Sequence, residues 1–291
     1  MGELYHLACQ CPCPCPCPCP FLYFNIKPSP PTNSTQTGTR STTPNYMYNK
    51  LIRYSIMATT TAGPTPGKPM SLGQHILDKG TEMLQSLKPV KQMQQHVCTF
   101  ALYSHDMNRQ IETHHYLTRA NEDFLQCAVY DSDTAHARLI GIEYIVSDRI
   151  FETLPPEEQK LWHSHAYEIK AGLWANPRVP EALHRPQLRN LTKSYGKLWC
   201  SWHTNRGDVL PLGVPSLMMS PQPMGSGILN SELVKSRDKR YGFDSDDLKK
   251  LRVEIEEPEW INPNADYWRN TSKGFFAEVE ETQMTRRALH P

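Results

Sequence analysis

The stretch RLIGIEYIVS, residues 138–147, sets the fold expected for this chain. It is rich in β-branched and aromatic residues, and Ile140, Ile142, Tyr144 and Val146 recur with the period of two that is typical of a strand. Three similar segments precede it, separated by polar clusters: HVCTFALY (96–103), IETHHYLT (111–118) and FLQCAVYD (124–131). Parallel pairing would need crossover helices, which this region lacks, so the segments predict one antiparallel sheet.

Two helices are expected to cover one face of this sheet, giving an α+β fold. Residues 71–87 carry apolar side chains at helical spacing, with Ser71 as a candidate N-cap and Pro89 just past the end. Residues 155–172 begin with two prolines and two glutamates, as helix starts do. Apolar residues then recur there every three or four positions, from Trp162 to Leu173. A further helix after Pro186 and a hairpin from KLWCSWHT (197–204) are also predicted.

The chain divides by composition into three parts. Residues 1–69 form a low-complexity leader, in which six of the nine cysteines lie between Cys9 and Cys19 and a Ser/Thr/Pro-rich stretch follows. Such a segment cannot bury a core, so we expect disorder there, and we hypothesise that translation starts naturally at Met57 or Met70. Residues 70–222 are the expected compact domain, and residues 223–291 a charged, partly helical and loosely ordered extension.

Charge and hydropathy exclude several classes of protein. The 31 basic and 30 acidic residues give a net charge of +1, which argues against binding nucleic acid. No stretch approaches the roughly 18 apolar residues that span a bilayer, and no signal-peptide pattern opens the chain. Cys98, Cys127 and Cys200 lie in apolar contexts that are typical of inert buried thiols.

Histidines suggest a metal site. Ten of the twelve lie between His75 and His203. In a helix, His163 and His165 would point about 200° apart and could not share a metal, which leaves His165 with Glu168 three residues on. The candidate ligands are His114, Glu143 and His165, with Glu112 as a fourth. A hydrogen-bonded His–Glu pair without metal is the more common arrangement. No catalytic motif is present, so we assign no catalytic residue and expect no cofactor.

Several segments resemble the plant oil body-associated protein family. They are SLKPVKQMQQHVCTFALYSHD, DFLQCAVYD, RLIGIEYIVS, PPEEQKLWHSHAYEIKAGLWANPRVP, YGKLWCSWHT, LPLGVPSLMMSP and ADYW. The resemblance runs from about Leu72 to Trp268. It implies a seed protein at the surface of oil bodies (lipid droplets) that supports their size and stability. The family brings no catalytic mechanism with it.

Without a long apolar segment, such a protein must sit on the phospholipid monolayer or on another coat protein. The candidate lipid contacts are Leu72, Ile76 and Leu84, with Lys79, Lys88 and Lys91 beside them. Packing on the sheet is the more common use of such a helix. The apolar LPLGVPSLMM (210–219) is a second candidate contact.

We therefore expect a non-enzymatic, reversibly attached peripheral protein of oil bodies with a cytosolic pool. The alternative is a metal-binding protein or enzyme that uses the His/Glu-rich site, acting on a lipid. The oligomeric state is left open.

Overall fold

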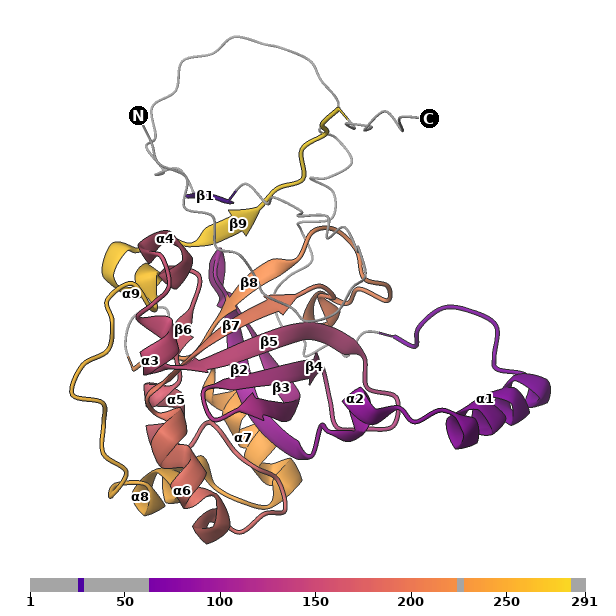
Figure 1. Ribbon diagram of the computed structural model, residues 1–291, viewed down its shortest axis with the longest axis horizontal. Coiled ribbons are helices and arrows are strands. Elements are labelled where there is room, and N and C mark those ends of the chain that lie inside the picture. Colours follow the sequence, from indigo (N-terminus) through magenta and orange to yellow (C-terminus); the bar gives the residue numbers. More distant parts are fainter. Residues whose placement is uncertain (1–25, 29–62, 224–227, 284–291) are drawn as a thin grey trace, which may run out of the picture.

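A computed structural model of the chain describes residues 26–28, 63–223 and 228–283. Most of the predicted leader, with the disorder and the late start proposed for it, lies outside these residues. The described part is a closed β-barrel with helices along one side and one helix standing apart (Figure 1).

Six strands form the barrel, and every pairing between them is antiparallel. They are β2 (Gln95–Tyr103), β3 (Asp106–Asn121), β4 (Phe124–Tyr130), β5 (Leu139–Ser147), β7 (Ser194–Cys200) and β8 (Ser216–Met219). Around the barrel the order is β5-β4-β3-β2-β8-β7, and β7 pairs back with β5. The predicted antiparallel strands and the β7–β8 hairpin are thus confirmed. The predicted single sheet with helices on one face is in fact closed into a barrel, because β7 pairs with both β8 and β5.

Two glycines lie on the seam where β7 meets β5. Gly141 pairs with Cys200 across the seam, and a Cβ on Gly141 would come within 2.3 Å of the Trp199 carbonyl oxygen. Gly196 pairs with Ile145 and faces the barrel interior. Only a residue without a side chain allows this close approach of the backbones.

The barrel interior is apolar at its ends and polar in its middle. On β5, Ile145 and Glu143 point inward and are buried, whereas Ile142 and Tyr144 are exposed. In a closed barrel, alternate residues of every strand point toward the axis, so Glu143 and Ile145 of β5 lie inside and the residues between them lie outside. The apolar side chains of the core cluster come from several strands and helices: Val97, Ala101, Tyr103, Ile111, Leu117, Leu125, Cys127, Val129, Leu198, Met218, Ile169, Trp174, Leu188 and Leu191.

The predicted helix over 155–172 is not continuous. This region forms α4 (Pro156–Gln159), the short strand β6 (His163–Ser164) and α5 (Ala166–Lys170). The apolar stripe that predicted one helix divides between two cores. Trp162 packs with Phe151 at the end of α3 (Asp148–Phe151), and Ile169 packs in the barrel core. β6 is held by pairing with β7, so tertiary pairing overrides the helical spacing.

Further helices surround the barrel (Figure 1): α6 (Glu181–Leu191), α7 (Ser231–Tyr241), α8 (Ser245–Leu251) and α9 (Tyr267–Thr271). The short η1 (Thr204–Arg206) follows β7, and β9 (Phe275–Ala277) pairs with β1 (Ile26–Pro28). Residues 231–252 are packed on the barrel, because Arg237 and Arg252 are buried and donate to backbone carbonyls of residues 169–174.

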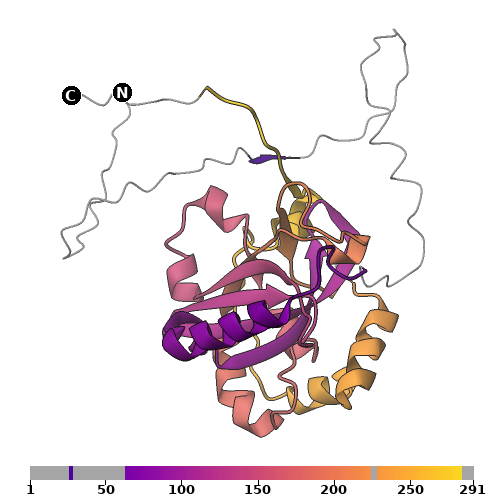
Figure 2. The same cartoon turned by 90° about the vertical axis from the view of Figure 1, so that its right-hand side faces the viewer.

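The helix predicted over 71–87 is confirmed as α1 (Leu72–Leu84), and the Ser71 side chain accepts a hydrogen bond from the Gln74 N–H at 3.2 Å. The prediction that α1 covers the sheet is wrong, because every one of its residues is exposed. Figure 1 shows it apart from the barrel, joined through α2 (Lys88–Lys91), and Figure 2 looks from its side, so that α1 lies in front of the barrel.

Candidate functional site

A cluster of three histidines around one carboxylate occupies the middle of the barrel. Glu143 Oε2 lies 2.8 Å from His115 Nδ1, and Glu143 Oε1 lies 3.1 Å from His163 Nε2 and 3.5 Å from His165 Nε2. All four side chains are at most 4% exposed. A carboxylate this deeply buried needs compensating partners, and histidines supply them here.

Each residue of the cluster is positioned by a different element. Glu143 and His115 point inward from β5 and β3. β6 places His163 opposite Gly196, and the turn after β6 brings in His165 as the N-cap of α5. Because His163 lies on a strand, the two histidines are not separated by a helical turn, and their rings are 5.2 Å apart.

Gly196 lies directly beside the point where the side chains of Glu143, His163 and His165 meet. A Cβ at this position would lie 2.5 Å from Glu143 Oε1 and 2.6 Å from Nε2 of both His163 and His165. Three side chains therefore converge over one glycine, and any larger residue there would fill the space between them.

A hydrogen-bond chain fixes the protonation of His165. The Ser194 hydroxyl donates to the Leu191 carbonyl at 2.7 Å, so it accepts from His165 Nδ1–H at 2.9 Å. The proton of a neutral His165 is therefore on Nδ1, and Nε2 carries a lone pair. This Nε2 is buried without a hydrogen-bond partner and faces the Glu143 carboxylate.

The charges of the cluster follow from burial and from these contacts. Burial favours a neutral Glu143, but the charge and hydrogen bond of His115, with the hydrogen bond of His163, hold the pKa of this carboxyl well below its usual range. Burial lowers the pKa of His163, yet the hydrogen bond and charge of Glu143 outweigh this and raise it above 6.5. Burial also lowers the pKa of His165, and at this residue the effect of burial is larger than the opposing effect of the Glu143 charge.

Glu168 lies beside the cluster as a second buried carboxyl. Its Oε1 is 3.8 Å from His165 Nε2, and its other oxygen accepts a hydrogen bond from the Thr99 hydroxyl. Burial raises the pKa of Glu168 to about 8. A cavity of about 10 Å³ is lined by Glu143, His163 and Glu168, which is room for about one water molecule.

A second His/Glu cluster lies on the outer face of β2 and β3. Glu112 accepts from the Cys98 thiol at 3.2 Å, contacts His114 Nε2 at 3.0 Å and pairs with Arg240 of α7 at 2.6 Å. The Tyr241 hydroxyl lies 3.4 Å from His114 Nδ1. The arginine supplies the charge that Glu112 needs, so this cluster is an ion pair under a helix.

The structure therefore divides the predicted metal ligands between two places. Glu143 and His165 lie together inside the barrel, whereas Glu112 and His114 lie together outside it. Sequence reasoning missed His163 and His115 as neighbours of Glu143. The alternation along β3 separates His114 from His115, but only the closed barrel shows which of them faces Glu143.

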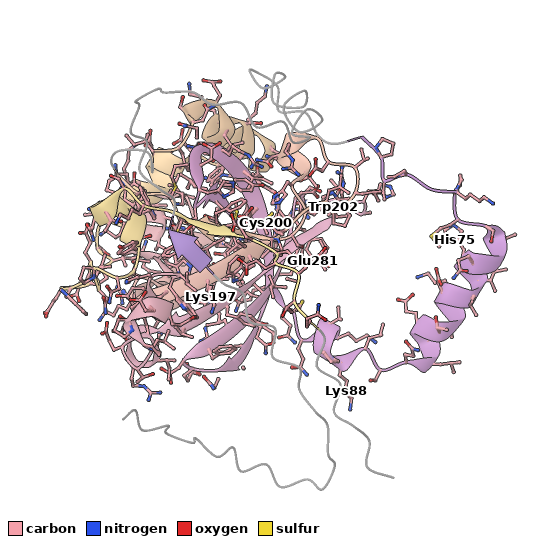
Figure 3. The ribbon with its side chains drawn as sticks, turned by 90° about the horizontal axis from the view of Figure 1, so that it is seen from above. His75, Lys88, Lys197, Cys200, Trp202 and Glu281 are labelled. Carbon is pink, nitrogen blue, oxygen red and sulfur yellow. The ribbon has the colours of Figure 1, made fainter. Side chains whose placement is uncertain are left out.

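The predicted lipid contacts remain exposed. Leu72 is 76% exposed, Ile76 65% and Leu84 89%. Figure 3 shows α1, marked by His75, and α2, marked by Lys88, away from Lys197 and Cys200 in the barrel. Lys79 pairs with Glu82 at 2.7 Å. Of the second predicted contact, Leu210 and Leu212 are exposed, whereas β8 is buried.

These features define a small closed-barrel protein with a buried His/Glu centre and a separate amphipathic helix. A family model described as "Protein of unknown function (DUF1264)" matches residues 87–256. The chain is 58% identical over 228 residues to oil body-associated protein 2B of Zea mays, which covers 78% of this chain and 91% of the relative.

The resemblance extends to further relatives. Identity is 56% over 226 residues to oil body-associated protein 2C of Arabidopsis thaliana, with 78% of this chain and 95% of the relative covered. It is 40% over 232 residues to protein 1B of that plant, with 79% and 94% covered. No solved structure matches the chain. The chain belongs to the oil body-associated protein family (DUF1264).

Proposed function

We propose that this protein is a peripheral, non-enzymatic component of the oil body surface, and that α1 attaches it to the phospholipid monolayer. The relatives are named for association with oil bodies. The observation that carries the proposal is the exposure of the whole apolar side of α1. An exposed apolar surface of this kind usually marks a contact.

The apolar residues of α1 form one clean side. At about 100° per residue, they and the two helix glycines fall within an arc of about 140°, and the polar residues fill the rest. The members of the arc are Leu72, Gly73, Ile76, Leu77, Gly80, Met83 and Leu84. A helix with this division lies in the plane of a membrane interface with its apolar side inserted.

Charge around the helix is modest. Lys79 is neutralised by Glu82, so the cations that add to the contact are Lys88 and Lys91 of α2, both exposed. Each lysine near an anionic lipid surface contributes about 1 kcal/mol. We infer that apolar insertion supplies most of the affinity and that α2 strengthens it.

The rest of the described chain offers no deeper anchor. None of its helices has both the length and the apolar character needed to cross a bilayer. We therefore propose a reversible attachment with a cytosolic pool. A folded barrel held at the monolayer would hinder contact between neighbouring oil bodies, which is how the protein would support their size and stability.

The test is replacement of Leu72, Ile76 and Leu84 by serine. We expect the tagged triple variant to leave the floating oil-body fraction while its thermal melt stays unchanged, because these side chains contact no core. A matched control replaces three exposed apolar residues elsewhere, Leu183, Val253 and Val279, which are 72–75% exposed. This control should remain on the oil bodies.

Synthetic triacylglycerol droplets coated only with phospholipid separate the lipid from a coat protein as partner. Binding of purified protein to these droplets, lost in the serine variant, supports the proposal. Wild-type protein that binds native oil bodies but not the synthetic droplets would show attachment through another coat protein and contradict it.

A further inference from the structure

We propose that Glu143, His163 and His165 form a binding site for one divalent first-row transition metal ion, of which Zn²⁺ fits the donor set best. The inference does not depend on attachment to oil bodies. It concerns the inside of the barrel, about which the relatives' names say nothing.

The spacing of the three donor atoms suits such an ion. Tetrahedral Zn²⁺ with bonds of 2.0–2.1 Å holds its ligand atoms roughly 3.3 Å apart. Glu143 Oε1 is 3.1 Å from His163 Nε2 and 3.5 Å from His165 Nε2, and all three atoms lie within 4.8 Å of one another. Small adjustments of the side chains would bring them around one ion.

Protonation favours an ion over a hydrogen bond at His165. Because Ser194 takes the Nδ1 proton, Nε2 presents a lone pair to a carboxylate oxygen with no proton between them. Two acceptors at this distance repel each other in a buried site, and a cation between them removes the repulsion. A histidine that ligates a metal commonly donates its other N–H in this way.

The charges around Glu143 also favour a bound cation. Among the described residues, the ion pairs of Glu143 are with histidines alone. The outer cluster differs, because Arg240 already neutralises Glu112 there. A buried carboxylate without lysine or arginine is stabilised either by a protonated histidine or by a bound cation.

The surroundings supply what a metal site needs beyond its ligands. His115 donates to the second oxygen of Glu143 and in turn contacts the Thr113 hydroxyl at 2.8 Å, which orients the carboxylate. Gly196 leaves the space beside the donors open. The cavity next to Glu143 and His163 has room for a water as a further ligand.

Because the site is enclosed, the experiment loads it during folding. The full chain, with the six cysteines between Cys9 and Cys19 replaced by serine so that they bind no metal, is unfolded in urea with a chelator and freed of the chelator. It is then refolded with ZnCl₂ or CoCl₂, desalted, and analysed by mass spectrometry for metal. This chain serves as the wild type in the comparisons below. We expect one ion per chain for the wild type and a rise in melting temperature over the metal-free protein. The Co²⁺ spectrum should show tetrahedral nitrogen and oxygen ligands without a thiolate charge-transfer band.

Variants locate the ion. Glu143→Gln and His165→Gln should lose stoichiometric metal, and Ser194→Ala should weaken affinity about 10–100-fold by releasing the orientation of His165. The matched controls are His114→Gln in the outer cluster and His75→Gln on α1, which should keep one ion per chain.

Three results would overturn the proposal. The first is a wild type that refolds without taking up metal, which would show that protons alone stabilise the cluster. The second is metal retained by folded His165→Gln but lost in His114→Gln. The third is a thiolate band in the Co²⁺-loaded chain that lacks the six N-terminal cysteines, which would place the ion at Cys98 or Cys127. This last measurement decides the question even if the interior variants do not fold.

Discussion

At the scale of single residues, Glu143 is a buried carboxylate that three histidines surround. Glu143 interrupts an apolar strand, and the pattern of β5 puts Ile142 and Tyr144 together on the side opposite to it. The sequence shows this alternation but not which side is inside. Burial of Glu143 is possible only because His115, His163 and His165 arrive from elements far apart in the chain. Sequence reasoning could therefore find Glu143 and His165 but not their full set of neighbours.

Arg252 is a second buried charge with a structural role. Its guanidinium donates to the carbonyls of Ile169 at 2.9 Å and Trp174 at 2.8 Å, and it pairs with both carboxylate oxygens of Glu181. The carbonyls belong to the end of α5 and the turn after it, where helix geometry leaves acceptors unpaired. Arg252 thus attaches the segment after α8 to the barrel.

We expect Arg252→Met to lower the free energy of unfolding by about 2–4 kcal/mol, because the carbonyls of Ile169 and Trp174 each lose a hydrogen bond and Glu181 loses its partner. Urea unfolding followed by circular dichroism measures this change. Lys249→Met, an exposed substitution on the same helix, is the control and should change stability by less than about 0.5 kcal/mol. Equal stability of the two variants would show that the arginine contributes nothing to the packing of α8.

At the scale of elements, apolar periodicity predicted that helices exist better than it predicted which surfaces those helices contact. The apolar side of α1 is visible in the sequence, but the same side would suit a sheet or a lipid surface equally well. Over 155–172 the spacing predicted one helix, whereas β6 interrupts it because pairing with Gly196 and Tyr195 of β7 is more favourable there. Spacing records which residues are apolar, and it cannot show that Trp162 and Ile169 belong to different cores.

Deletion of α1, residues 72–84, should leave the melting temperature within about 2 °C of the wild type, because no side chain of the helix is buried. The same variant should fail to bind oil bodies under the proposed mode of attachment. Differential scanning calorimetry and flotation assays test the two effects separately. Trp174→Ala, which removes a buried core side chain, provides the comparison and should lower the melting temperature clearly. A similar loss of stability on removing α1 would mean that the helix packs on the folded protein after all.

At the scale of the whole molecule, closure of the barrel separates what the sequence could predict from what it could not. Local hairpins from β2 to β5 follow from strand patterns and short turns. The strand that closes the ring, β7, begins 47 residues after β5 ends. No local pattern in the sequence indicates that pairing. Gly141 and Gly196 lie where the two strands meet, but a glycine alone does not identify the partner strand. On the outer face of the barrel, α7 packs over β2 and β3, and α1 stays exposed.

A molecule built in this way should be held on the oil body only at one edge, by a short helix and two lysines. Burying the few apolar side chains of α1 gives at most about 1.5–3 kcal/mol each, before the cost of ordering and partial insertion is subtracted. Lys88 and Lys91 add an electrostatic contribution that salt screens over about 10 Å at 0.1 M. A carbonate wash combines high ionic strength with alkaline pH, and both weaken electrostatic attachment to a lipid surface.

We therefore expect a carbonate wash to release most of the protein from isolated oil bodies, and high salt to release a smaller part. Lys88→Gln with Lys91→Gln should abolish the effect of salt, because apolar insertion alone remains, and should lower the bound fraction before any wash. Immunoblots of the floating and soluble fractions measure both. A co-purified protein with a long apolar anchor serves as the control that the oil bodies stay intact. If carbonate leaves all of the protein on the oil bodies, a contact larger than α1 and α2 must hold it, and peripheral attachment by one helix is wrong.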